Sequence, residues 1–187
     1  IQEDGCIVIV GDFTTFNGYN RVRVARLMPN GDVDVSFDPE IGPDLGVNSV
    51  DIMSNGDIII GGDFKTFNLQ PCVGVAQLDA WGQLVKSFSA DGGVNGSVKK
   101  VIAQSDFKIL AAGLFTKFGE TVANRILRLN QDGTLDDEFQ AGAGANAAIY
   151  ELRLQPDGKI IVGGDFNRFD GLNKNAVVRL NRDGSVD

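Results

Sequence analysis

Residues 61–68 read Gly-Gly-Asp-Phe-Lys-Thr-Phe-Asn, and variants of this stretch recur three more times in the chain. The copies are Gly11-Asp12-Phe13-Thr14-Thr15-Phe16-Asn17, Gly113-Leu114-Phe115-Thr116-Lys117-Phe118 and Gly164-Asp165-Phe166-Asn167-Arg168-Phe169. The differences between equivalent positions, 62 − 11, 113 − 62 and 164 − 113, all equal 51. A fixed period of about this length is typical of a repeat architecture, so the repeat is identified before any local secondary structure.

The first half of each repeat predicts a hairpin of two strands. In the second copy, an apolar segment starts at Val47, and Asn55-Gly56 is a turn sequence because both residues accept a positive φ. The run Ile58-Ile59-Ile60 follows, and a continuous β-branched run is typical of a strand buried on both faces. We therefore expect residues 57–62 to form a central strand.

The second half of each repeat predicts two further strands. Residues 73–79 form the expected third strand, and residues 84–88 form the expected outer fourth strand. Phe64 and Phe67 lie between the second and third strands, where we expect a loop that seals the gap between neighbouring units. No segment of ten or more residues has a helical period, so the sequence predicts an all-β chain.

Four-stranded antiparallel sheets that repeat every 40–50 residues are typical of β-propeller blades. We expect one domain over residues 1–187, built of four blades or forming an arc of a larger propeller. The approximate repeats are 1–46, 47–97, 98–148 and 149–187, of which the first and the last are incomplete. A linear β-solenoid is the alternative architecture, although its coils are usually shorter than 51 residues.

The combined motif of the last repeat resembles the delta-sixty β-propeller repeat. It reads Gln-Pro-Asp-Gly-Lys-Ile-Ile-Val-Gly-Gly-Asp-Phe over 155–166 and Arg-Leu-Asn-Arg-Asp-Gly-Ser-Val-Asp over 179–187. Trp81, Phe107 and Leu114 depart from the motif in single copies. The resemblance implies a propeller of bacterial surface or secreted proteins and of phage structural proteins, mostly without an assigned activity.

Composition disfavours several classes of function. The chain has 17 basic and 25 acidic residues, and its net charge of −8 would repel a nucleic acid backbone. No apolar run approaches the roughly 20 residues of a membrane span. Histidine is absent, which removes the commonest general base and metal ligand near neutral pH. Cys6 and Cys72 occupy different places in the repeat, so we expect two isolated thiols rather than a bridge.

Three groups of repeated side chains are expected to hold the blades together. The aspartates after the central strand should cap the following turn through backbone N–H groups, because a residue repeated in most copies usually serves the blade itself. The arginines of the third strand should form ion pairs with those aspartates, and the phenylalanines should seal neighbouring units. The three groups are Asp12, Asp63 and Asp165; Arg26, Arg128 and Arg179; and Phe13, Phe64, Phe115 and Phe166.

Positions that differ between copies are the expected binding positions, because loops on a rigid scaffold usually carry specificity. These loops are 17–21, 68–72, 119–123 and 170–174 within repeats, and 38–46, 90–96 and 141–146 between them. Tyr19 and Trp81 are the candidate glycan-stacking or protein-contact side chains. The acidic turn 132–138 lacks the ligand order of a calcium-binding loop, so we expect a solvated hairpin with at most weak calcium binding.

The sequence favours a non-catalytic scaffold or binding module that mediates protein or glycan interactions, without a cofactor. We expect it outside the cell, on a bacterial surface or in a virion. One alternative is a glycan hydrolase or lyase that uses loop carboxylates. Another is a structural subunit: Ile1 matches Ile52 and Asp187 matches Asp34, so we expect a partner protein or the rest of a longer chain to complete the propeller.

Overall fold

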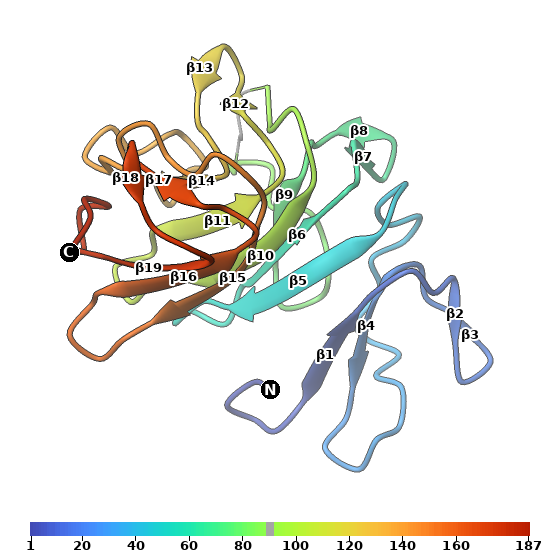
Figure 1. Cartoon of the computed structure of the whole chain (residues 1–187). Helices are drawn as coiled ribbons and strands as arrows, with labels where there is room; N and C mark the ends of the chain where they lie inside the picture. Colours follow the sequence, from blue (N-terminus) through green and yellow to red (C-terminus); the bar gives the residue numbers. More distant parts are fainter. Residues whose placement is uncertain (89–91) are drawn as a thin grey trace.

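The structure, a computed structural model, describes residues 1–88 and 92–187. These residues form short β-strands and turns and contain no helix, so the all-β prediction is confirmed. Four small antiparallel sheets follow one another along the chain and lie face to face in an arc (Figure 1). We call them blades 1 to 4. Because the described part has no helix, no helix there is long and apolar enough to span a membrane.

The blades are built from equivalent strands that recur 51 residues apart, beginning at Val47, Val98 and Ile149 in blades 2 to 4. Blade 1 contains β1 (Ile7–Val10) and β4 (Val24–Leu27); blade 2 contains β5 (Val47–Ile52), β6 (Ile58–Gly62) and β9 (Val75–Leu78); blade 3 contains β10 (Val98–Ala103), β11 (Ile109–Gly113) and β14 (Ile126–Leu129); blade 4 contains β15 (Ile149–Leu154), β16 (Ile160–Gly164) and β19 (Val177–Leu180).

The segment expected as a loop between the second and third strands is a small hairpin in every repeat. The four hairpins are β2 (Thr15–Phe16) with β3 (Tyr19–Asn20), β7 (Thr66–Phe67) with β8 (Gln70–Pro71), β12 (Lys117–Phe118) with β13 (Thr121–Val122), and β17 (Arg168–Phe169) with β18 (Leu172–Asn173). The loop prediction was wrong here because a two-residue strand leaves no period to detect in the sequence.

The predicted four-stranded blade is also corrected, because blades 2 to 4 are three-stranded sheets. The segment expected as a fourth strand in blade 2 makes one isolated bridge, Leu84 to Leu78. Beyond it, the Phe88 amide donates to the Val85 carbonyl at 3.1 Å, which turns the chain away from the sheet. Phe88 is 8% exposed after this turn. Over the described residues 85–88, the chain therefore makes no further strand pairs but buries an aromatic ring.

The turn between the first two strands of a blade requires one residue in the left-handed backbone conformation, with a positive φ. Gly56 occupies it in blade 2 with φ of 88°, as the sequence predicts. In blade 3 the same position is Phe107, whose φ of 64° lies in the region that L-residues rarely adopt. Phe107 packs against the apolar cluster between blades 2 and 3, and this contact offsets the unfavourable backbone conformation.

Apolar packing between successive sheets forms the core. We call the face of a blade that meets the next blade its forward face, and the opposite face its rear face. Ile59 and Val75 on the forward face of blade 2 share one cluster with Val98, Val101 and Ile109 on the rear face of blade 3. These five side chains are at most 1% exposed, and equivalent clusters join blade 1 to 2 and blade 3 to 4.

The first strands of neighbouring blades also lie against one another, which places β5, β10 and β15 on the inside of the arc. Their hydrogen bonds cross the blade boundary: the Val101 amide donates to Ser49 Oγ at 3.1 Å, and the Ala103 amide donates to Asp51 Oδ2 at 2.8 Å. Blades are therefore connected by polar contacts at the inner strands and by apolar contacts across their faces.

The repeated phenylalanines allow a test of this packing. Phe115 is fully buried between blades 2 and 3, whereas Phe13 in blade 1 remains partly exposed. Phe115→Ala should lower the free energy of unfolding by about 3–5 kcal/mol, because it opens a cavity in a close-packed core. Phe13→Ala should cost roughly 1–2 kcal/mol. Urea denaturation measures both values, and equal losses would contradict the proposed packing.

Candidate binding site

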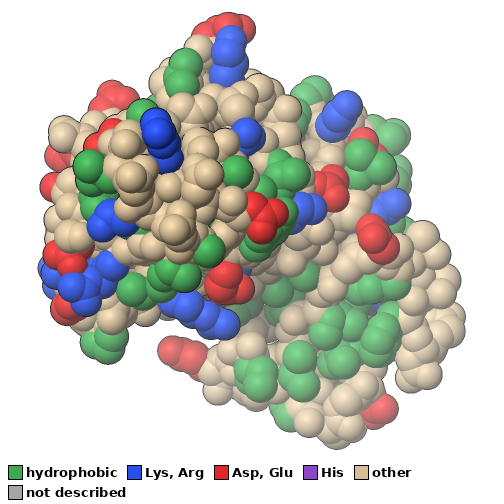
Figure 2. Space-filling model, viewed as in Figure 1, with side chains coloured by type: hydrophobic (Ala, Val, Ile, Leu, Met, Phe, Trp, Pro, Cys, Tyr) green, Lys and Arg blue, Asp and Glu red, His purple; other side chains and the backbone are tan. Residues whose placement is uncertain are grey.

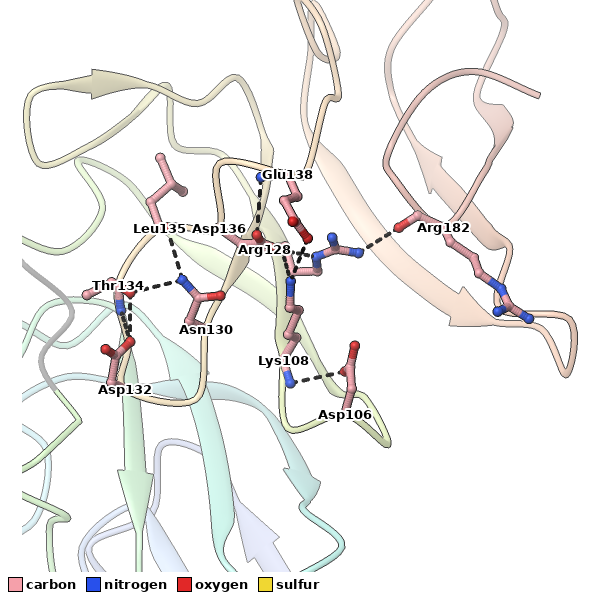
Figure 3. Close-up of polar contacts among 10 residues, drawn as sticks. All are labelled: Asp106, Lys108, Arg128, Asn130, Asp132, Thr134, Leu135, Asp136, Glu138 and Arg182. Carbon is pink, nitrogen blue, oxygen red and sulfur yellow. Dashed lines mark hydrogen bonds and ion pairs between the residues drawn. The ribbon is translucent and has the colours of Figure 1, made fainter.

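The repeated arginines form ion pairs, but not with the predicted aspartates. Arg128 Nε donates to Asp136 Oδ2 at 2.5 Å, where Lys108 Nζ also approaches to 2.8 Å (Figure 3). Arg26 and Arg179 make the equivalent bonds to Asp34 and Asp187, at 2.7 and 2.6 Å. The prediction that these arginines pair with Asp12, Asp63 and Asp165 was wrong. In each pair the carboxylate comes from the segment that follows the third strand.

Two of these arginines also reach the next blade. Arg26 Nη1 donates to the Ala80 carbonyl at 2.7 Å, and Arg128 Nη1 donates to the Arg182 carbonyl at 2.6 Å (Figure 3). Their guanidinium groups lie 5.1 and 5.0 Å from the ring centres of Phe37 and Phe139. One side chain thus joins the outer edge of its own blade to the neighbouring blade.

In blade 2, a different hydrogen bond replaces the arginine–aspartate ion pair. Gln77 replaces the arginine and Val85 replaces its carboxylate partner, so both members of the ion pair have changed together. Gln77 Nε2 instead donates to Asp57 Oδ2 at 2.7 Å. The paired change keeps Gln77 hydrogen-bonded at 5% exposure, as a buried polar group requires.

The aspartates after the central strand lie at the surface, and two of the three bond to side chains. Asp63 accepts from Ser97 and from Asn48, and Asp165 accepts from the Tyr150 hydroxyl at 2.8 Å. Asp12 has no side-chain partner among the described residues. The expectation that these aspartates cap the turn through backbone N–H groups was wrong.

Other residues cap those turns. Asp44 Oδ1 accepts from the Lys65 and Thr66 amides at 2.8 and 3.0 Å. Asn95 and Asn146 do the same for the next two hairpins. Sequence reasoning missed this group, although its members recur at the 51-residue spacing and differ only between carboxylate and amide.

A groove lies in the same place in blades 1, 2 and 3, between the small hairpin and the segment that follows the third strand. Its volume is about 610 Å³ in blade 1, 620 Å³ in blade 2 and 350 Å³ in blade 3. These volumes fall within the range of roughly 300–1,000 Å³ that is usual for small-ligand sites. The grooves are therefore the candidate binding sites of the fold.

The lining of the groove differs from blade to blade. The residues are Asn20, Arg21, Val22, Asp38, Glu40 and Ile41 in blade 1; Glu40, Asn68, Gln70, Pro71, Cys72, Gln83, Leu84, Lys86 and Phe88 in blade 2; and a set within 121–144 that includes Asn124, Arg128, Asp136, Asp137 and Gln140 in blade 3. Much of this lining comes from the loops predicted to be variable, of which Ala90 and Asp91 lie outside the described residues.

Cys72 is the one thiol in these linings. Burial raises its pKa to about 12, and its thiol donates to the Val75 carbonyl at 3.4 Å, so it remains protonated near neutral pH. Cys6 and Cys72 are both free, as expected from their positions in the repeat.

Both candidate contact aromatics are accessible: Tyr19 is 45% and Trp81 is 64% exposed. Tyr19 belongs to the hairpin beside the blade 1 groove, with its ring centre 6.0 Å from Arg21 Cζ. The Trp81 carbonyl accepts a hydrogen bond from the Asp38 amide at 2.9 Å. Tyr19 thus lies beside the blade 1 groove, and the Trp81 backbone contacts Asp38, which lines it. Ligand contact of either side chain stays a prediction.

Three carboxylates of the acidic turn are bound by side chains of the same blade. Asp132 accepts from Thr134, Asp136 from Arg128 and Lys108, and Glu138 from Lys108 (Figure 3). No group of three potential metal-ligating side chains is found over 1–88 and 92–187. Weak calcium binding at this turn stays a prediction.

The contribution of each repeated arginine to the free energy of unfolding should depend on whether a neighbouring blade covers it. Arg128 is 7% exposed beneath blade 4, whereas the side chain of Arg179 on the last blade is 49% exposed. Arg128→Ala should lower the free energy of unfolding by about 3 kcal/mol, because it leaves the buried Asp136 carboxylate with Lys108 as its remaining cationic partner. Arg179→Ala should cost under about 1 kcal/mol. Urea denaturation of the two variants measures the difference, and equal losses would contradict the role of the neighbouring blade.

The same cluster predicts a pH dependence. Burial opposes the charged form of Asp136, but hydrogen bonds from Lys108 and Arg128 outweigh it and lower the pKa of Asp136. The stability from this pair is therefore present above the ordinary carboxyl pKa of 3.8 and is lost as pH falls through the lower folded-state pKa. The stability difference between wild type and Asp136→Asn should be constant from neutral pH to about pH 4 and shrink below it.

Urea denaturation at several pH values measures that difference, and Asp137→Asn is the matched control because Asp137 is exposed. The control should lie close to wild type at every pH. A stability difference for Asp136→Asn that stays constant well below pH 4 would contradict the assignment.

Comparison with known proteins gives a family but no activity. No curated protein matches the chain. Among solved structures, a protein of unknown function from Bacteroides caccae shares 13% sequence identity, with a TM-score of 0.43 over 99% of this chain and 67% of that one. Residues 2–37, 104–139 and 155–187 match the family described as a domain of unknown function (DUF5122) beta-propeller. These ranges cover more than half of the sequence, and the chain belongs to the DUF5122 β-propeller family.

Proposed function

We propose that the chain is a non-catalytic β-propeller scaffold of the delta-sixty repeat type. It presents variable loops for protein or glycan binding and joins a larger assembly through an open sheet face. One observation carries the assembly role. Val75 and Ile126 are 1% and 3% exposed beneath the next blade, whereas the equivalent Val177 of blade 4 is 59% exposed.

The forward face of blade 4 has a glycine at the position where a glycine in blade 2 lets the next blade approach closely. At Gly61 in blade 2, a Cβ would lie 2.7 Å from the γ carbons of both Val98 and Val101 in the next blade. At the equivalent Gly163, the nearest atoms are 3.9 and 4.0 Å away and belong to blade 4 itself. The forward face of blade 4 therefore has room for a strand like β10, whose valines fill the same space in blade 2.

Blade 1 supplies the other open surface. β1 pairs only with β4 among the described strands, whereas β6, β11 and β16 pair on both edges. Hydrophobic side chains gather on the surface over β1 and β4 (Figure 2). The occupant proposed for these surfaces is a further repeat of the same kind, from the same polypeptide or from another subunit.

The repeated charged residues support a scaffold rather than acid–base chemistry. Asp34, Asp136 and Asp187 are each bound by an arginine, which keeps the carboxylate charged and oriented toward its own blade. A general acid or base needs a proton that it can exchange with a substrate. A bacterial surface or virion location belongs to the same proposal and rests on the resemblance of the repeat alone.

Sedimentation velocity over a concentration series tests the assembly role. The wild-type chain should associate, and Val177→Asp should weaken the association at least about tenfold, because it buries an unpaired charge. Val122→Asp is the matched control: Val122 is 68% exposed on β13, away from the open face. At concentrations where every chain is a monomer, both variants should keep the wild-type unfolding temperature. Identical sedimentation of wild type and Val177→Asp would contradict the assembly role.

A further inference from the structure

Arg21 in the blade 1 groove is a buried cation with few partners. Its side chain is 9% exposed. Nη1 donates to the Asn20 carbonyl at 2.8 Å, Nη2 is 3.5 Å from the Asp34 carbonyl, and buried Nε has no partner in the described part of the chain. The closest carboxylate is Asp38, whose Oδ1 lies 3.9 Å from Nη1. A guanidinium carries five donors, and leaving them unused in a buried place is costly.

The repeat does not require this arrangement. The positions equivalent to Arg21 are Cys72 in blade 2, Ala123 in blade 3 and Lys174 in blade 4. The positions equivalent to Tyr19 are Gln70, Thr121 and Leu172. The hairpin and sheet form in these blades without an arginine or an aromatic residue. The combination of an arginine with an aromatic residue at these two positions is therefore specific to blade 1, and the architecture of the blade does not explain it.

The groove combines donors, acceptors and apolar surface. Arg21, Asn20, Asp38 and Glu40 all line it, and the side chain of Asp38 is 60% exposed. Ile41 is 56% and Tyr19 45% exposed beside it. One guanidinium against two carboxylates gives a net negative site on a chain of net charge −8, which disfavours an anionic ligand.

We infer that the blade 1 groove binds a neutral saccharide. A sugar hydroxyl both donates and accepts hydrogen bonds, so one ring can accept from Arg21 and donate to Asp38 or Glu40. The apolar face of a sugar ring matches an accessible aromatic such as Tyr19. The volume of about 610 Å³ is sufficient for a short oligosaccharide. This inference rests on the proposed binding function of the variable loops and names their ligand class.

Isothermal titration calorimetry of the full chain tests the inference. The probes are neutral pentasaccharides of glucose, mannose and xylose, with an oligogalacturonate of the same length as the anionic comparison. At least one neutral probe should bind, and the anionic probe should bind more weakly than that probe. Tyr19→Ala and Asp38→Asn should each weaken binding at least about tenfold. Both side chains are exposed enough for the variants to fold.

Arg21→Gln should also lose binding, and its melting temperature reports whether the fold persists. Leu172→Ala and Lys174→Gln are the matched controls, at the positions in blade 4 equivalent to Tyr19 and Arg21 and outside the grooves, and should bind as wild type. Loss of binding in either control, with binding kept in Tyr19→Ala and Asp38→Asn, would overturn the blade 1 site while leaving the loops as binding elements.

Two other outcomes also overturn the inference. One is the absence of binding by every neutral probe at about 10 mM, a concentration that detects millimolar affinity. The other is tighter binding of the oligogalacturonate. Both leave the assembly role untouched, because sedimentation of Val177→Asp tests that role separately. Cleavage of a probe during the titration, abolished by Asp38→Asn, would overturn the non-catalytic proposal as well.

Discussion

Apolar packing of each sheet on the next is the interaction on which this structure depends. A three-stranded sheet of short strands cannot bury both of its faces alone, and the central strands here are apolar on both sides. Stacking solves this for β6 and β11, in which every residue is buried, and only in part for β1 and β16 at the ends of the arc. Stability should therefore follow the number of covered faces rather than the number of strands.

Much of the architecture could be predicted because the same short sequence patterns occur in each copy of the repeat. The Ile58-Ile59-Ile60 run and the Asn55-Gly56 turn are short, but four copies in register exclude most alternatives. Two details could not be predicted. The small hairpins are too short for a period, and the fourth strand is replaced by a turn that buries Phe88. In the second case, burial of an aromatic ring rather than strand pairing determines the local structure.

The candidate site shows the limit of sequence reasoning more clearly. Repetition identified Arg128 as structural, but not Asp136 as its partner, because pairing depends on which side of the sheet each residue faces. The change from Arg–Asp to Gln77 and Val85 in blade 2 is visible in the sequence and points to the correct pair. Tyr19 was recognisable as a variable aromatic, whereas the buried Arg21 beside it was not, since burial and missing partners are seen only in three dimensions.

Native-state hydrogen exchange tests the central role of face-to-face packing most directly, because it reports the opening free energy of each strand separately. Amides of β6 and β11 should exchange most slowly and together, through global unfolding, because both faces of their sheets are covered. Amides of β1 and β4 should exchange faster, since blade 1 has two strands and one covered face. Protection of β1 and β4 equal to that of β6 and β11 would contradict the account.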